Sequence, residues 1–139
     1  MTSRISHTAV DSGDAYAQSC WWAAALEMAE DPEDPNEPGH EECMIFSPDG
    51  RTRLLFVVVP EPKTVKNRLH LDLRPSEGAT REEEVARLLA LGARQVGDHR
   101  RPDGSGWLTL ADPEGNEFCV LRGDAEVADP HAHLLSRPS

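Results

Sequence analysis

A histidine stands at the centre of a short alternating segment, RLHLDL, at residues 68–73. Polar and apolar residues alternate in it without a break, which is typical of a half-buried β-strand. Its leucines share one face, and Arg68, His70 and Asp72 share the other. The polar face of such a strand commonly meets only water. A functional role for His70 therefore depends on which other residues converge on it.

Few other side chains are candidates for chemistry. His7 lies in a predicted strand just before a helix, 63 positions ahead of His70. Trp107 alternates with Leu108 and Leu110, so we expect its ring to face away from the leucines, where it can wall a pocket. The remaining histidines are weaker candidates, because they fall in an acidic loop (His40), at a hairpin end with Arg100 and Arg101 (His99), or in the tail (His131 and His133).

Composition narrows the class of protein. The chain has 139 residues, 38% of them hydrophobic, enough for one ordinary domain with one core. A net charge of −11 argues against nucleic acid and against anionic membranes. No segment resembles a signal peptide or a membrane span. Three widely spaced cysteines without a CxxC motif indicate reduced thiols, so a cytoplasmic protein is expected.

Periodicity and turn residues predict the elements that must position these side chains. Asp14 and Thr80 are the expected N-caps of two helices, and Glu83 completes a capping box with Thr80. Helices are predicted over 14–29 and 80–91, and strands over 4–10, 43–46, 52–59, 68–73, 94–99, 106–111 and 116–123. Residues 30–42 hold three prolines and seven acidic side chains, which predicts a solvated loop. Residues 124–139 show no strong pattern.

The chain repeats this order. A strand, a helix and three strands are predicted over 5–59 and again over 68–122. Turn SPDG at 47–50 matches DPEG at 112–115 with an offset of 65, and the two helix caps are 66 positions apart. Similar offsets from separate features indicate an internal duplication.

The segments EPKTVKNRLHLDL, REEEVARLLALGA and WLTLADPEGNEFCVL resemble the glyoxalase-like branch of the vicinal oxygen chelate superfamily. That superfamily includes glyoxalase I, bleomycin-resistance proteins, extradiol dioxygenases and fosfomycin-resistance enzymes. The resemblance implies an α+β fold with one glyoxalase-like domain at 4–123. Module one would span 4–60 and module two 67–123, each a βαβββ unit that curls its sheet into half of a shared cup with the helices outside.

The resemblance also implies a set of site residues. Metal-using members take ligands from the first and last strands of each module, which here implies His7, His70 and Glu117. Glu117 would also be the catalytic residue. Glyoxalase I has a four-ligand arrangement. Its fourth ligand position, in the last strand of module one, falls near Thr52 or Arg53, and neither is a carboxylate. Two histidines and one carboxylate suit a divalent ion such as iron, manganese, zinc or nickel. The pocket would be lined by Arg68, Asp72, Trp107 and Cys119.

Two functions stay open at this point, besides a scaffold whose site has decayed. In one, the metal acts as a Lewis acid on a small molecule with vicinal oxygens, in isomerase, lyase or dioxygenase chemistry. In the other, the cup binds a drug or metabolite without metal, as bleomycin-resistance proteins do. The family commonly pairs its subunits, so a homodimer is expected, with the Trp21–Trp22 helix as a contact surface.

Overall fold

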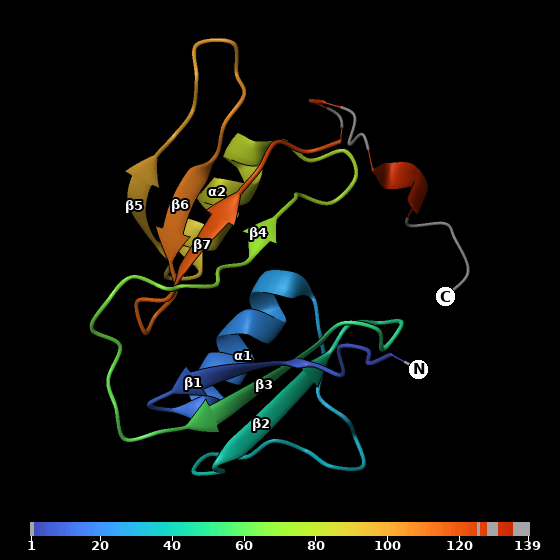
Figure 1. Ribbon diagram of the computed structural model, residues 1–139, viewed down its shortest axis with the longest axis vertical. Coiled ribbons are helices and arrows are strands. Elements are labelled where there is room, and N and C mark those ends of the chain that lie inside the picture. Colours follow the sequence, from blue (N-terminus) through green and yellow to red (C-terminus); the bar gives the residue numbers. More distant parts are fainter. Residues whose placement is uncertain (1, 125, 128–130, 135–139) are drawn as a thin grey trace. The chain divides into compact units, whose positions relative to one another are not determined.

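The structure, a computed structural model, describes residues 2–124, 126–127 and 131–134. It divides into two compact units, Met1–Val65 and Lys66–Ser139, which we call module one and module two. Each module packs one main helix on one small mixed sheet (Figure 1). The predicted α+β fold class is confirmed.

Module one consists of β1 (Thr8–Ser12), α1 (Ala15–Leu26), β2 (Glu42–Phe46) and β3 (Arg53–Val58). Its sheet has the order β1-β3-β2, in which β1 is parallel and β2 antiparallel to β3. Compared with the predicted elements, the first strand lies further along the chain and the helix is shorter at its end. His7 therefore directly precedes the first strand.

The core of module one lies between α1 and its sheet. Trp22 and Ala25 of α1 are buried, as are Ile45 of β2 and Leu54 and Phe56 of β3. The buried positions alternate along both strands, as expected for a sheet covered on one face. Burial of these side chains is the main stabilisation of the module.

Three strands were predicted after the helix of module one, but only β2 and β3 form, and a single bridge at Ala29 stands where module two has β5 (Arg94–Asp98). Ala29 pairs with Phe46 through two backbone hydrogen bonds of 2.8 and 2.9 Å. Beyond it the proline-rich acidic loop begins, and proline lacks the N–H that a longer ladder needs. Within the loop, the side-chain amide of Asn36 donates to the carbonyl of Met44 on the outer edge of β2, at 2.8 Å.

Module two contains β4 (Asp72–Leu73), α2 (Arg81–Ala90), β5 (Arg94–Asp98), β6 (Leu108–Ala111) and β7 (Glu117–Val120). The sheet order is β4-β7-β6-β5, with β4 parallel to β7 and the other neighbours antiparallel. This is the full βαβββ order. A short 3₁₀ helix, Ala132–Leu134, follows in the tail.

The capped helix α2 covers one face of this sheet (Figure 1). Thr80 Oγ1 accepts a hydrogen bond from the backbone N–H of Glu83 at 3.2 Å, as the capping box predicted. Val85 and Leu88 of α2 are buried, together with Leu110 and Phe118 of the sheet. The opposite face is left for polar side chains.

The strand predicted over 68–73 is mostly not a strand. Only Asp72–Leu73 is regular, and Leu69 is 87% exposed instead of packing under α2. The strand is short because β4 lies at the edge of its sheet and has one neighbour, β7. The pairing with β7 begins at the carbonyl of Leu71, which accepts from the N–H of Cys119 at 2.9 Å.

In the part of the chain that the structure describes, no helix has the length and apolar character needed to cross a membrane.

Candidate functional site

His70 and Asp72 lie two residues apart, and their side chains are in contact. The imidazole Nδ1 lies 3.2 Å from the Asp72 carboxylate, and both side chains are partly exposed, at 37% and 52%. When Nδ1 donates to this carboxylate, Nε2 carries the free lone pair. Asp72 thus orients the ring and fixes its tautomer, as outer carboxylates do for metal-binding histidines.

Cys119 of β7 is the direct neighbour of Asp72 in the parallel ladder. Its Sγ lies 4.0 Å from His70 Nδ1 and 3.6 Å from the hydroxyl of Thr109 on β6. Burial raises the pKa of the Cys119 thiol, and the Thr109 hydrogen bond lowers it in part. Without a metal the thiol is therefore protonated at neutral pH.

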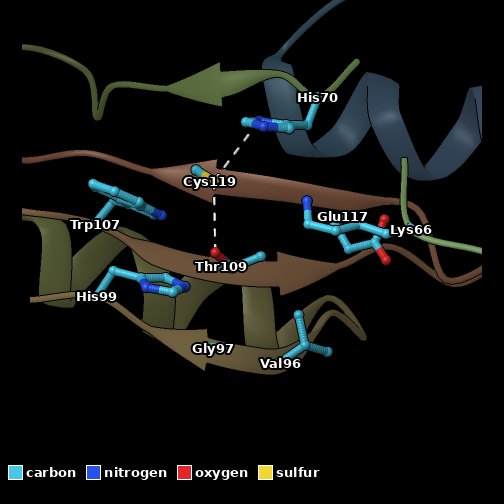
Figure 2. Close-up of a pocket in the computed structure, with 9 residues that line it drawn as sticks. All are labelled: Lys66, His70, Val96, Gly97, His99, Trp107, Thr109, Glu117 and Cys119. Carbon is cyan, nitrogen blue, oxygen red and sulfur yellow. Dashed lines mark hydrogen bonds between the residues drawn. The ribbon is translucent and has the colours of Figure 1, made fainter. Parts of the chain in front are cut away.

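A cavity of about 460 Å³ opens on this face of the module-two sheet (Figure 2). Of the metal ligands and pocket residues that the resemblance implied, four line it: His70, Trp107, Glu117 and Cys119. Arg68 and Asp72, which were expected to line a pocket, are not lining residues; Asp72 contacts His70 instead. The lining residues that the sequence interpretation did not assign to a pocket wall are Lys66, Val96, Gly97, His99 and Thr109.

His99 and Trp107 form a stacked aromatic pair in the wall of this cavity. Their ring centroids are 5.0 Å apart and the planes differ by 26°. The His99 N–H donates to the carbonyl of Trp107 at 2.9 Å, so His99 does stand at a hairpin end, but its side chain also faces the pocket. Residues opposite each other on neighbouring strands share a face, which is the signal that would have found His99 beside Trp107.

Glu117 begins β7 and lines the same cavity, two residues before Cys119. Its Oε2 accepts a hydrogen bond from the backbone N–H of Asn67 at 3.0 Å. The neighbouring Lys66 directs its ammonium group over the sheet (Figure 2), and its positive charge acts to lower the pKa of Cys119. The wall therefore carries the Glu117 carboxylate, the His70 imidazole and the Lys66 ammonium group next to the aromatic pair.

His7 is exposed in module one, and its Nδ1 lies 3.0 Å from the hydroxyl of Ser6. Both predicted ligand histidines thus have a polar partner at Nδ1. The proposed set of His7, His70 and Glu117 draws on both modules and stays a prediction.

Strand register shows which positions of the two modules correspond. Ile45 pairs with Leu54 in module one, and Leu110 pairs with Phe118 in module two, all four buried. The same alignment makes Arg53, which begins β3, the counterpart of Glu117. The fourth place of the four-ligand arrangement is therefore an arginine, with Nε donating to the Gly50 carbonyl at 3.0 Å.

The same register relates the first strands. Thr8 pairs with Leu54, and extension of the β4–β7 register by one residue places Leu71 opposite Phe118. His7 and His70 each directly precede these residues, so they occupy equivalent positions.

The donors present fit a divalent metal ion. One ligand atom each from His70, Asp72 and Cys119 lie within 4.8 Å of one another. Nitrogen, oxygen and sulfur donors together suit an ion of the zinc class. Glu117 is not one of these three, but it offers a further carboxylate on the wall of the same cavity.

A model of the glyoxalase-like domain family matches residues 7–121. The chain belongs to this family, and thus to the vicinal oxygen chelate superfamily. No curated protein matches it.

Solved structures show the same fold. The fosfomycin resistance protein FosX from Listeria monocytogenes, an E126Q mutant complexed with Mn(II) and 1S,2S-dihydroxypropylphosphonic acid, has a TM-score of 0.64 at 16% identity, over 96% of this chain and 99% of that one. Lactoylglutathione lyase from Agrobacterium tumefaciens has a TM-score of 0.59 at 20% identity, over 92% and 98%. Oxidase ChaP-H2 has a TM-score of 0.60 at 23% identity, over 87% and 94%. At these identities the likeness concerns the fold alone.

Proposed function

We propose that this glyoxalase-like protein is a metal-dependent enzyme that acts on a small molecule with oxygens on adjacent atoms. The observation that carries the proposal is that His70, two residues before β4, and Glu117, the first residue of β7, both line one cavity of about 460 Å³. Support also comes from the Mn(II) complex of the structural neighbour FosX.

Each residue has a distinct role in this proposal. His70 and Glu117 hold the metal, with His7 of module one as the predicted third ligand. Asp72 holds the His70 ring through Nδ1, at 3.2 Å. When bound, a divalent ion supplies Lewis acidity toward two neighbouring oxygens. Glu117 is also placed to move a proton of the bound molecule, and Lys66 attracts developing negative charge.

Metal analysis of the purified full chain tests this proposal. We expect about one divalent ion per chain, lost in His70→Ala and reduced in Glu117→Gln and His7→Ala. His40→Ala is the matched control, because His40 is an exposed histidine outside the cavity. Protein that takes up no iron, manganese, zinc or nickel would contradict the metal-dependent function.

A second function, metal-free binding of a drug or metabolite, is favoured by the stacked His99–Trp107 pair. A flat aromatic surface binds planar or cationic groups without any metal, and the chain's net charge of −11 attracts cations. Titration of metal-stripped protein with a cationic glycopeptide, followed by tryptophan fluorescence, tests this alternative. Binding that is lost in Trp107→Ala but kept in Trp21→Ala would favour it over the enzyme.

A further inference from the structure

We propose that His70, Asp72 and Cys119 form a metal site of their own within module two, selective for a zinc-class ion through a thiolate ligand. This inference rests on the proposed function only in sharing His70 as a ligand; Asp72, which there holds the His70 ring through Nδ1, is here a metal ligand itself. It needs neither Glu117 nor module one.

The backbone places the three side chains on one face. Asp72 and Cys119 are paired across the parallel β4–β7 ladder, so their side chains point to the same side. His70 precedes Asp72 by two residues, and its Nδ1 approaches both Asp72 and Cys119. The hydrogen bond from the Cys119 N–H to the Leu71 carbonyl, 2.9 Å, fixes the chain between them.

The distances are close to those of a metal centre. The Cys119 Sγ to His70 Nδ1 distance is 4.0 Å, the His70 Nδ1 to Asp72 Oδ1 distance is 3.2 Å, and all three donors lie within 4.8 Å. Bonds of about 2.0 to 2.3 Å put tetrahedral ligand atoms roughly 3.5 Å apart. The His70 and Asp72 side chains are partly exposed, which leaves them room to rotate toward such spacing.

The neighbours of the Cys119 thiol position its sulfur for ligation. The Thr109 hydroxyl, 3.6 Å from Cys119 Sγ, orients it from the next strand. The open side of the group faces the cavity, which leaves a coordination position for water or a ligand. Binding releases the thiol proton to solvent. A thiolate ligand favours zinc-class ions over manganese or magnesium, which prefer oxygen donors.

Cobalt(II) titration of the metal-stripped full chain tests the inference, because thiolate ligation of cobalt produces a charge-transfer absorption band in the near ultraviolet. We expect this band at one ion per chain. Cys119→Ser should abolish the band and weaken cobalt binding by more than about 100-fold. That loss exceeds the one expected from mutating a residue that only orients a metal ligand. Cys20→Ser is the matched control and should keep the band. Absence of the band, or its persistence in Cys119→Ser, would overturn the inference.

Alkylation of the unmutated protein provides a readout that does not depend on folding of a variant. Saturating Zn²⁺ should protect Cys119 at least tenfold while leaving Cys43, a buried thiol in module one, unaffected. Equal rates for Cys119 with and without Zn²⁺ would overturn the site.

The Glu117→Gln variant separates this inference from the function proposed above. A cobalt thiolate band that survives in Glu117→Gln supports the local site even if the enzyme hypothesis fails. One bound ion without a thiolate band, lost in Glu117→Gln, supports the enzyme hypothesis and overturns the local site.

Discussion

The three cysteines show how the environment of one residue type decides its chemistry. Cys20 is exposed on α1, whereas Cys43 and Cys119 are buried in strands. Burial raises the pKa of Cys43, and a hydrogen bond with Ser19 offsets this in part. Because the thiolate is the nucleophile, a raised pKa lowers reactivity at a given pH. Only Cys119 combines burial with neighbouring metal-binding donors.

We therefore predict that iodoacetamide labels Cys20 first at pH 7 and Cys43 at least tenfold more slowly. The thiolate fraction of Cys43 rises about tenfold for each pH unit below its raised pKa, so its labelling should accelerate steeply as the pH increases. Mass spectrometry of labelled peptides measures both rates. Equal rates for the two thiols at pH 7 would contradict the prediction.

Residue patterns predicted the polar face of 68–73 and the ring of Trp107, because alternation in a strand needs only the local sequence. They did not predict Lys66 or His99 as lining residues. Their position depends on how strands pair, which is a relation between distant segments. The group of His70, Asp72 and Cys119 likewise arises from the β4–β7 register.

At the scale of elements, the hairpin loop between β5 and β6 is held by a buried arginine. Arg81, at the start of α2, is 3% exposed and donates to the carbonyls of Gly106 and Gly104 at 3.1 and 3.2 Å. Gly106 has a φ of +92°, and a Cβ there would come within 2.0 Å of the His99 carbonyl oxygen. Arg81 and Gly106 thus set the position of the aromatic pair.

Arg81→Met should lower the free energy of unfolding by on the order of 2–4 kcal/mol, because two partly buried carbonyls lose a charged donor. Hydrogen exchange should accelerate in residues 99–107. Arg94→Met, at an exposed position of β5, is the control and should change stability by less than about 0.5 kcal/mol. Urea unfolding and exchange measurements check both variants, and unchanged exchange in 99–107 would contradict this role.

Thr80→Ala removes the N-cap of α2, whose hydroxyl accepts from the Glu83 N–H. We expect the free energy of unfolding to fall by about 1 kcal/mol. Thr64→Ala, an exposed threonine outside the helices and strands, serves as the control. Urea denaturation measures the difference, and equal midpoints for the two variants would contradict the capping role.

Helices and hairpins were predictable because caps, turns and periodicity are local. The lengths of the strands at the sheet edges were not predictable from the sequence. Leu69 lies outside β4 and Ala29 makes only a bridge, since an edge segment pairs only as far as its one neighbour and its prolines allow.

At the scale of the molecule, the two modules share an order of elements but not a distribution of polar groups. The Asp72–Cys119 pair of module two corresponds to the Ala9–Leu55 pair of module one, and Glu117 corresponds to Arg53. The two modules therefore have similar frameworks, while the chemically versatile side chains are concentrated in module two.

We predict that the full chain is a homodimer in solution. Trp22 is buried in module one, so of the two tryptophans only Trp21 is available as a contact. Leu69, at 87% exposure, adds apolar surface that a partner would cover. Sedimentation velocity should give twice the mass of one chain, and Leu69→Lys should shift the equilibrium toward monomer. Leu89→Lys on α2 is the control, and a clean monomer at all concentrations would contradict the prediction.

The single bridge at Ala29 has a consequence for behaviour in concentrated solution. Where module two has β5, the outer edge of β2 carries that bridge and the amide of Asn36. An open strand edge invites pairing with other chains, which is the first step of fibre growth. The loop that holds Asn36 contains seven carboxylic acids, so like charge repels a second edge of the same kind. At neutral pH this charge opposes such pairing; acidification that neutralises the loop should therefore promote association.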